Sequence, residues 1–120
     1  MKKIRIGVLG PSDIAKRRMI PALNKSKYCE YAGVAAALPE ERSDGSGQTD
    51  PARKEELNAA YKRGLEKADE LKRAFDGEIY EGFMSMLNTD DIDAVYIALP
   101  PYLHAKWAKE ALKRGKHVLL

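Results

Sequence analysis

Short apolar runs alternate along the chain with longer segments in which apolar residues recur at helical spacing. The runs Ile4–Leu9, 28–38 and 94–99 predict three buried strands, the second of them centred on the small residues 33–37. Minimal strands are expected at 78–80 and 117–120. Each predicted strand is followed along the chain by a segment with helical character, except the last, which ends the sequence.

Four helices are expected between these strands, at residues 13–24, Pro51–Phe75, 83–87 and 103–114. The longest has apolar residues every three or four positions, which form one stripe for packing on a core. Asp13 is the expected N-cap of the first helix, and Pro21 inside that helix should kink it or remove one backbone hydrogen bond. Gly115 should close the last helix.

The order of these elements is βαβαβαβαβ, which predicts a parallel sheet with helices on both faces. The expected fold is a single α/β domain over residues 1–120, a Rossmann-type doubly wound sheet in a three-layer αβα arrangement. Ligands of such sheets bind beyond the carboxyl ends of the strands, where the strand order reverses. The turns at Gly10 and at Leu99-Pro100 both follow strands, so they should flank that crevice.

Residues 39–50, with the sequence PEERSDGSGQTD, interrupt this pattern between the second strand and the longest helix. The segment is polar and glycine-rich, so it predicts a mobile loop. Asp50 and Pro51 at its end are suited to begin the following helix as N-cap and first helical residue.

Composition narrows the class of protein. The chain has 44% apolar and 32% charged residues and a net charge of +3, with basic and acidic residues interleaved, so no nucleic-acid partner is indicated. No segment approaches the ~20 apolar residues of a membrane span. The single cysteine, Cys29, cannot form an internal disulfide, which favours a reducing, cytoplasmic setting. Two distant histidines and one cysteine give no metal-ligand spacing.

A glycine-containing turn follows the first strand in the sequence GVLGPSDIA. The dinucleotide fingerprint is G-x-G-x-x-G/A, and here Gly10 and Ala15 occupy its first and last positions. Ser12 replaces the middle glycine, although its hydroxyl can donate to a phosphate oxygen, and Pro11 removes one N–H donor. The turn therefore predicts a pyrophosphate site, and a purely structural strand-to-helix turn is the alternative interpretation.

No acidic residue stands at the tip of the second strand, where NAD sites place one for the ribose hydroxyls. Glu40 or Arg42 could fold back to read the adenosine ribose, or both could be solvated loop charges. The choice between NAD and NADP stays open on this ground. His104 begins the last helix near the expected crevice, or it is a surface histidine, and the run of cations at residues 16–18 is interpreted as a solvated helix face.

Three stretches resemble, in their order along the chain, the amino-terminal domain of the Gfo/Idh/MocA oxidoreductases: GVLGPSDIA, MIPAL and DAVYIALPPYLHAKWAKEALKRGKHVLL. The last stretch is the specific one, with an aspartate, a buried strand, proline, histidine, A-x-x-A-L and then GKHVLL. The resemblance covers the chain from end to end and is weak over residues 43–74.

The resemblance implies a dinucleotide cofactor, NAD or NADP, as partner. Two sets of residues would contact it: Gly10, Pro11, Ser12, Asp13 and Ile14 along the pyrophosphate, and Ala98, Leu99, Pro100, Leu103 and His104 on the nicotinamide side. Family members move a hydride between the nicotinamide and a sugar, polyol or nucleotide sugar held by a second domain. Their catalytic lysine follows the HVL segment, beyond Leu120, so no catalytic residue and no substrate domain are expected in this chain.

The function expected from the sequence is therefore the NAD(P)-binding domain of a sugar-directed oxidoreductase, inactive by itself. The alternatives are a stand-alone nucleotide-binding or regulatory module and a domain that binds nothing. Residues 117–120 should form an apolar edge strand, with Lys116 as the one nearby charge to discourage pairing. A homodimer through that edge is the expected assembly.

Overall fold

The computed structural model of the chain describes residues 3–42 and 51–119 and contains one five-stranded sheet in the order β3-β2-β1-β4-β5. All four neighbouring pairs are parallel. The strands are β1 (Ile4–Leu9), β2 (Cys29–Ala36), β3 (Glu78–Glu81), β4 (Ala94–Ile97) and β5 (His117–Leu119). The chain crosses from β3, at one edge, back to β4 beside β1, so the strand order reverses between β1 and β4. The predicted doubly wound fold is confirmed.

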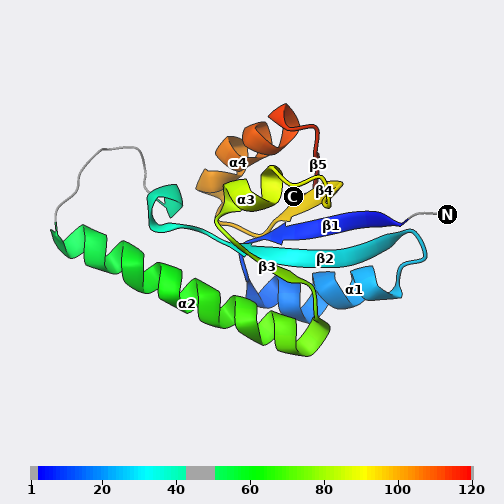
Figure 1. The fold of residues 1–120 in the computed structure, drawn as a ribbon, viewed down its shortest axis with the longest axis horizontal. Coiled ribbons are helices and arrows are strands. Elements are labelled where there is room, and N and C mark those ends of the chain that lie inside the picture. Colours follow the sequence, from blue (N-terminus) through cyan, green and yellow to red (C-terminus); the bar gives the residue numbers. More distant parts are fainter. Residues whose placement is uncertain (1–2, 43–50, 120) are drawn as a thin grey trace.

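Helices cover both faces of this sheet (Figure 1). On one side lie a π-helical turn (Ala15–Met19), α1 (Ile20–Lys25) and α2 (Pro51–Phe75), and on the other lie α3 (Phe83–Leu87) and α4 (Pro101–Lys113). Each side has its own buried cluster. Leu71 of α2 packs with Ile6 and Val34 of the sheet, whereas Trp107 of α4 packs with Phe83 and Val95. The sheet is thus buried on both faces, which explains why β1 and β2 are apolar over their buried carboxyl-terminal parts.

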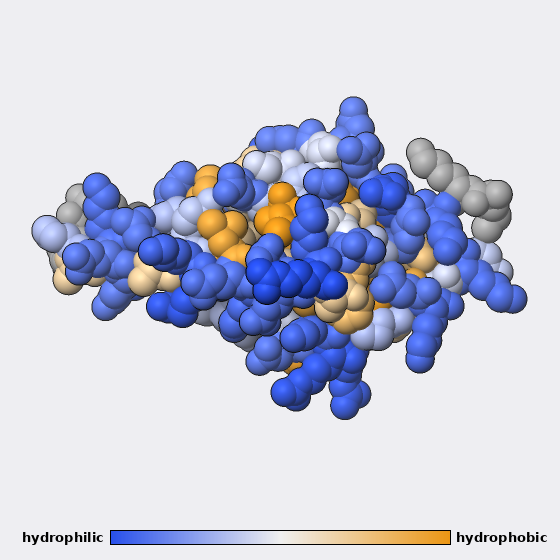
Figure 2. All heavy atoms as spheres, turned by 60° about the horizontal axis from the view of Figure 1, so that its bottom comes forward, coloured by the Kyte–Doolittle hydropathy of each residue, from blue (hydrophilic) through white to orange (hydrophobic). Residues whose placement is uncertain are grey.

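The outer surface over α1 and α2 is largely hydrophilic, with apolar side chains confined to small islands (Figure 2). This agrees with the predicted stripe of α2, in which Ala68 and Leu71 are buried while most residues on the other side of the helix are exposed. Across the described residues, we find no helix that is long and apolar enough to cross a membrane.

The first helix begins differently from the expectation. Ser12, and not Asp13, caps it: the Ser12 Oγ accepts a hydrogen bond from the Ala15 N–H at 3.1 Å. The expected disturbance at Pro21 takes the form of the π-helical turn, where the Ile20 N–H donates to the Ala15 carbonyl five residues back. The wider turn brings Ala15 and Ile20 onto the same buried face, although a spacing of five places two residues on different faces of a regular α-helix.

Several other boundaries differ from the expectation. The strands expected at 28–38 and 94–99 are shorter, at Cys29–Ala36 and Ala94–Ile97. Helix α4 begins at Pro101 and not at residue 103, because proline is suited to the first helical position, where no N–H is needed. The segment 39–50 is not a loop at its start, since Pro39–Arg42 form a 3₁₀ turn. The rest of the predicted loop, residues 43–50, lies outside the described residues.

The junction of α4 with β5 corrects the expectation for Lys116. Gly115, at φ 76°, ends the helix, and the Lys116 N–H bonds back to the Ala111 carbonyl at 3.0 Å, as in a Schellman motif. The Lys116 side chain turns inward and is only 8% exposed. Its Nζ donates to the carbonyls of Thr89 at 2.6 Å and Ile92 at 2.7 Å. It therefore anchors β5 to the segment before β4 and does not guard the sheet edge.

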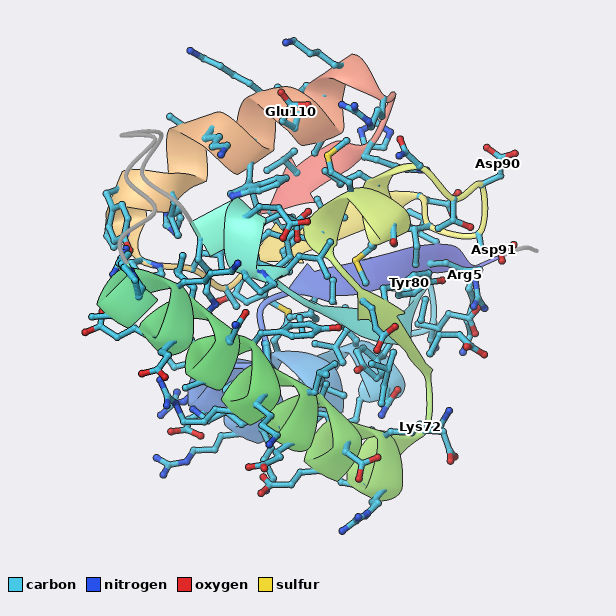
Figure 3. All side chains as sticks on the ribbon, turned by 60° about the vertical axis from the view of Figure 1, so that its left-hand side comes forward. Arg5, Lys72, Tyr80, Asp90, Asp91 and Glu110 are labelled. Carbon is cyan, nitrogen blue, oxygen red and sulfur yellow. The ribbon has the colours of Figure 1, made fainter. Side chains whose placement is uncertain are left out.

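At the amino ends of the strands, Arg5 joins segments that are far apart in sequence (Figure 3). Its Nε donates to the Asp91 carbonyl and its Nη1 to the Glu30 carboxylate, both at 2.9 Å. These contacts lie at the opposite end of β1 from Gly10. Polar contacts thus join β1, β2 and the segment before β4 at this end of the sheet.

Candidate functional site

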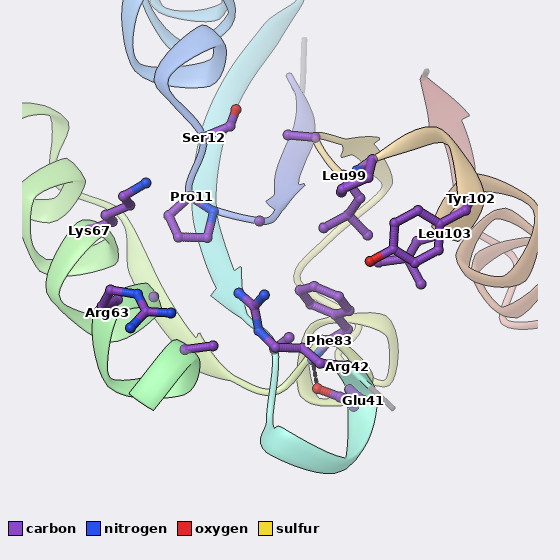
Figure 4. A pocket seen from close by; sticks show the side chains of 16 residues that line it. Pro11, Ser12, Glu41, Arg42, Arg63, Lys67, Phe83, Leu99, Tyr102 and Leu103 are labelled. Atoms are coloured by element: carbon purple, nitrogen blue, oxygen red, sulfur yellow. Dashed lines mark hydrogen bonds between the residues drawn. The ribbon is translucent and has the colours of Figure 1, made fainter. Parts of the chain in front are cut away.

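A pocket of about 310 Å³ lies at the carboxyl ends of β1 and β4, where the strand order reverses (Figure 4). Its walls come from the turn after β1, the 3₁₀ turn after β2, the middle of α2, and the turn between β4 and α4. The lining residues are Gly10, Pro11, Ser12, Ala37, Glu41, Arg42, Ala60, Arg63, Gly64, Lys67, Phe83, Ala98, Leu99, Pro100, Tyr102 and Leu103. Both turns that the sequence placed beside the crevice border it.

The turn after β1 requires glycine at position 10. Gly10 has φ +97°, and a Cβ on it would lie 2.9 Å from the Ala98 carbonyl oxygen and 2.9 Å from Leu99 Cδ2. The backbone of the first turn can therefore approach the second turn only without a side chain here. The Ser12 Oγ already accepts the Ala15 N–H, but its own proton remains available to a ligand.

Seven of the ten residues named above as cofactor contacts line the pocket. Asp13 and Ile14 do not line it, and their side chains are exposed, so they could contribute only the backbone N–H groups of the helix start. His104 also does not line it. The His104 Nε2 lies 2.6 Å from the Leu99 carbonyl oxygen, so this ring nitrogen carries the proton and donates, and the side chain holds the turn that does line the pocket.

Glu41 is a pocket residue that the sequence analysis passed over in favour of its neighbours. It is 7% exposed, and its carboxylate accepts three backbone N–H groups, from Leu38 at 2.8 Å, Phe83 at 2.8 Å and Met84 at 3.1 Å. The carboxylate thus joins the end of β2 to the start of α3. No local pattern distinguishes Glu41 from Glu40, because its three donors come together only in the folded chain.

Two cations of α2, Arg63 and Lys67, line the same pocket and were also missed. They lie four residues apart and therefore on one helix face, beside the small residues Ala60 and Gly64. Figure 4 shows both side chains reaching in from the α2 side, facing the wall that contains Leu99 and Leu103. The sequence did offer a signal for them, namely two cations four residues apart beside two small residues. Arg42, considered above as a ribose contact, lines the pocket, whereas Glu40 does not.

Three tyrosines have raised pKa values, and burial is the main cause for each: Tyr31, Tyr61 and Tyr80. Nearby carboxylates raise the pKa of Tyr61 and Tyr80 further. All three hydroxyls stay protonated at neutral pH, and none belongs to the pocket lining. In the described part of the chain, no group of three or more histidine, cysteine, aspartate or glutamate side chains is arranged to hold a metal ion.

Comparison with known proteins gives matches over nearly the whole chain. The Gfo/Idh/MocA model, described as an oxidoreductase family with an NAD-binding Rossmann fold, matches residues 4–120. A dTDP-3,4-didehydro-2,6-dideoxy-alpha-D-glucose 3-reductase of Actinomadura kijaniata is 36% identical over 116 residues, which are 97% of this chain and 27% of the reductase. The D-xylose 1-dehydrogenase (NADP(+)) 2 of Haloferax volcanii is 34% identical over 94% of this chain and 27% of its own length.

The crystal structure of KijD10, a 3-ketoreductase from Actinomadura kijaniata in complex with NADP and TDP-benzene, superimposes with a TM-score of 0.73. The two sequences are 36% identical, and the match covers 98% of this chain and 28% of the KijD10 chain. The chain thus spans little more than a quarter of the length of the relatives that it matches.

Proposed function

The chain belongs to the Gfo/Idh/MocA family of oxidoreductases, and from this premise we propose that its pocket binds the nicotinamide cofactor of a sugar-directed oxidoreductase. The observation that carries the proposal is the position of the pocket. The pocket lies where the strand order reverses. It is bordered by the turn at Gly10, where a Cβ would lie 2.9 Å from atoms of Ala98 and Leu99. In doubly wound sheets this is where dinucleotides bind.

Two walls of the pocket would contact different parts of the cofactor. Gly10, Pro11 and Ser12 would hold the pyrophosphate, with the Ser12 hydroxyl proton and the free N–H groups of the helix start as donors. Ala98, Leu99, Pro100 and Leu103 form the largely apolar wall for the nicotinamide side, and His104 would position this wall through the Leu99 carbonyl. When bound, the nicotinamide supplies or accepts the hydride.

The substrate class that we propose is a nucleotide sugar, one of the three classes that the sequence suggested. The Actinomadura kijaniata reductase, which is named for a dTDP-linked keto sugar, supports this choice at 36% identity. We propose that the complete oxidoreductase reduces a keto group on such a sugar, and that this chain contributes cofactor binding to the reaction.

Titration of the purified chain with NADPH and NADH tests cofactor binding directly. The single tryptophan, Trp107, is in edge-to-face contact with Phe83, which lines the pocket, at a centroid distance of 4.9 Å. Energy transfer from Trp107 to a reduced nicotinamide should therefore quench the tryptophan emission. Calorimetry with the oxidised cofactors gives an independent measurement of the same site.

We predict that Gly10→Val abolishes binding of both cofactors, because the new side chain would collide with Ala98 and Leu99 at the pocket. The matched control is Gly115→Val. Gly115 also has a positive φ, +76°, but a Cβ there has nothing within 4 Å and the residue is not part of the pocket. Both substitutions place a β-branched residue at a positive φ, so both strain the backbone. Thermal unfolding of each variant shows whether it is still folded, which separates loss of folding from loss of the site.

The proposal requires that the parent chain and Gly115→Val bind cofactor and that folded Gly10→Val does not. Equal binding by parent and Gly10→Val would remove this turn as the cofactor site. A parent chain that binds neither NADPH nor NADH would contradict the proposed function itself.

A further inference from the structure

Three cations gather on one wall of the pocket, and none of them pairs with a carboxylate of the described residues. Arg42 follows β2, whereas Arg63 and Lys67 come from α2. No ion pair or hydrogen bond joins any of the three to another of the described residues. By contrast, Arg73 on the exposed face of the same helix pairs with Asp69 at 2.8 Å.

Gly64 lies where α2 approaches the end of β2 and the Arg42 side chain. A Cβ on Gly64 would lie 3.6 Å from the Ala36 Cβ and 3.9 Å from Nη2 of Arg42. The Arg42 guanidinium group therefore lies against the surface of α2, next to the residue that follows Arg63. In Figure 4 Arg63 extends toward the same part of the pocket as Arg42, and Lys67 extends toward Pro11 of the phosphate turn. The two arginines thus come together beside the end of β2.

The one carboxylate among the lining residues cannot offset this charge or bind a ribose hydroxyl. Glu41 already accepts three backbone N–H groups from Leu38, Phe83 and Met84. A doubly wound site that reads NAD needs a free acidic acceptor near the end of the second strand, for the 2′-hydroxyl. This pocket has no such free acceptor among its lining residues and has uncompensated guanidinium groups instead.

We propose that Arg42 and Arg63 bind the 2′-phosphate of NADP(H), so that the crossover helix α2, and not only the turn after β2, sets the choice of cofactor. The inference rests on the proposed function, because the phosphate is recognised as part of a dinucleotide bound in this pocket. Guanidinium groups form paired, charge-assisted hydrogen bonds with phosphate oxygens, which fits a dianionic group held between two arginines. Lys67 adds positive charge on the pyrophosphate side, which both cofactors share.

The test compares Arg63→Ala with Lys62→Ala in the purified 120-residue chain. Lys62 is the adjacent cation on α2, is exposed and does not line the pocket, so it controls for helix propensity and net charge. The dissociation constants of NADPH, NADH, 2′,5′-ADP and 5′-AMP are measured for the parent and both variants. The last two ligands report on the phosphate without the nicotinamide.

We expect the parent to bind NADPH and 2′,5′-ADP roughly tenfold or more tightly than NADH and 5′-AMP. Arg63→Ala should lower the ratio of NADPH affinity to NADH affinity roughly tenfold while leaving the NADH affinity unchanged. Lys62→Ala should change neither the ratio nor the NADH affinity. Arg63→Lys should keep part of the preference, because the charge stays but the paired hydrogen bonds do not.

Two results would overturn the inference while leaving the proposed function intact. One is a parent chain that binds NADH as tightly as NADPH. The other is an Arg63→Ala variant in which both affinities fall together or neither falls, since the arginine would then not read the 2′-phosphate. If neither dinucleotide binds the parent, the proposed function fails, and the inference about α2 fails with it.

Discussion

At the scale of single residues, the buried carboxylate of Glu41 holds the walls of the pocket in place through hydrogen bonds to the backbone. Glu41 satisfies N–H groups at the end of β2 and at the start of α3, where the first turn of the helix has no intrahelical acceptors. It therefore fixes the position of Phe83 and of the 3₁₀ turn that contains Arg42. The role of Glu41 is structural, but its effect is to hold two walls of the pocket together.

We predict that Glu41→Ala lowers the free energy of unfolding by about 2–4 kcal/mol, because three buried or partly buried N–H groups lose a charged acceptor. Glu41→Gln should lose less, since its amide oxygen can still accept the two bonds that Oε1 now accepts, from Leu38 and Phe83. Chemical denaturation measures both. Glu40→Ala is the control, because Glu40 is exposed and a change there should stay within about 0.5 kcal/mol. Equal losses at the two glutamates would refute this role.

At the scale of elements, α2 has two unlike halves. Its first six residues, 51–56, are all exposed, and the amino end of the helix extends beyond the sheet in Figure 1. Farther along, Gly64, Ala68 and Leu71 are buried against the sheet. The pocket residues Arg63 and Lys67 lie in the packed half, so the cations project from a firmly held surface.

We predict that hydrogen exchange is faster for the amides of residues 55–58 than for those of residues 67–71, because only the second group lies where the helix is packed on the core. Mass spectrometry of peptides from α2 would resolve the difference. NADPH should slow exchange around residues 60–67 and leave the amino-terminal turns unchanged. Uniform protection along α2 without ligand would contradict the division into two halves.

The sequence predicted the elements well where apolar patterning decides them. The bounds of β1, α2 and α3 match the expectation, because their apolar residues recur at strand or helix spacing. Two errors concern side chains that bond to the backbone. Ser12 replaces Asp13 as the cap, and Lys116 bonds to carbonyls more than twenty residues away. The Ser12 cap is local, since serine and aspartate are both suited to the position and the sequence does not decide between them. The partners of Lys116 are set by the packed fold and leave no local signal.

At the scale of the whole molecule, the same limit applies to the site. The Gly10 and Leu99 turns were predictable, since parallel strands bring their carboxyl ends to one edge. The cationic wall was not, because nearly all of α2 lies within residues 43–74, which resemble the family weakly, and its contact with Arg42 arises only when α2 packs on β2. Helical spacing placed Arg63 and Lys67 on one face but did not show what that face meets.

The edge strand β5 carries the remaining prediction. It pairs only with β4 in the sheet of the described residues, and Leu119 is 42% exposed. Since Lys116 is turned inward, it does not block this edge. We predict that the 120-residue chain in isolation associates through β5, because unpaired strand edges recruit a partner strand.

Sedimentation over a wide concentration range measures that association, with Leu119→Lys expected to return the chain to monomers. Leu112→Lys is the matched control, since Leu112 is also an exposed leucine, at 62%, but lies on α4. A parent chain that stays monomeric at high concentration, or a dimer that survives Leu119→Lys, would show that the edge is not the contact.

The π-helical turn that follows the Gly10 turn has a consequence for chain length. Ala15 and Ile20 share a buried face at a spacing of five residues, one more than a regular helical turn needs. The helix thus absorbs one surplus residue without moving Gly10 at one end or Leu23 at the other. Deletion of one of the exposed residues 16–18 would give Ala15 and Ile20 the spacing of a regular helix, so we expect the pocket to stay unchanged.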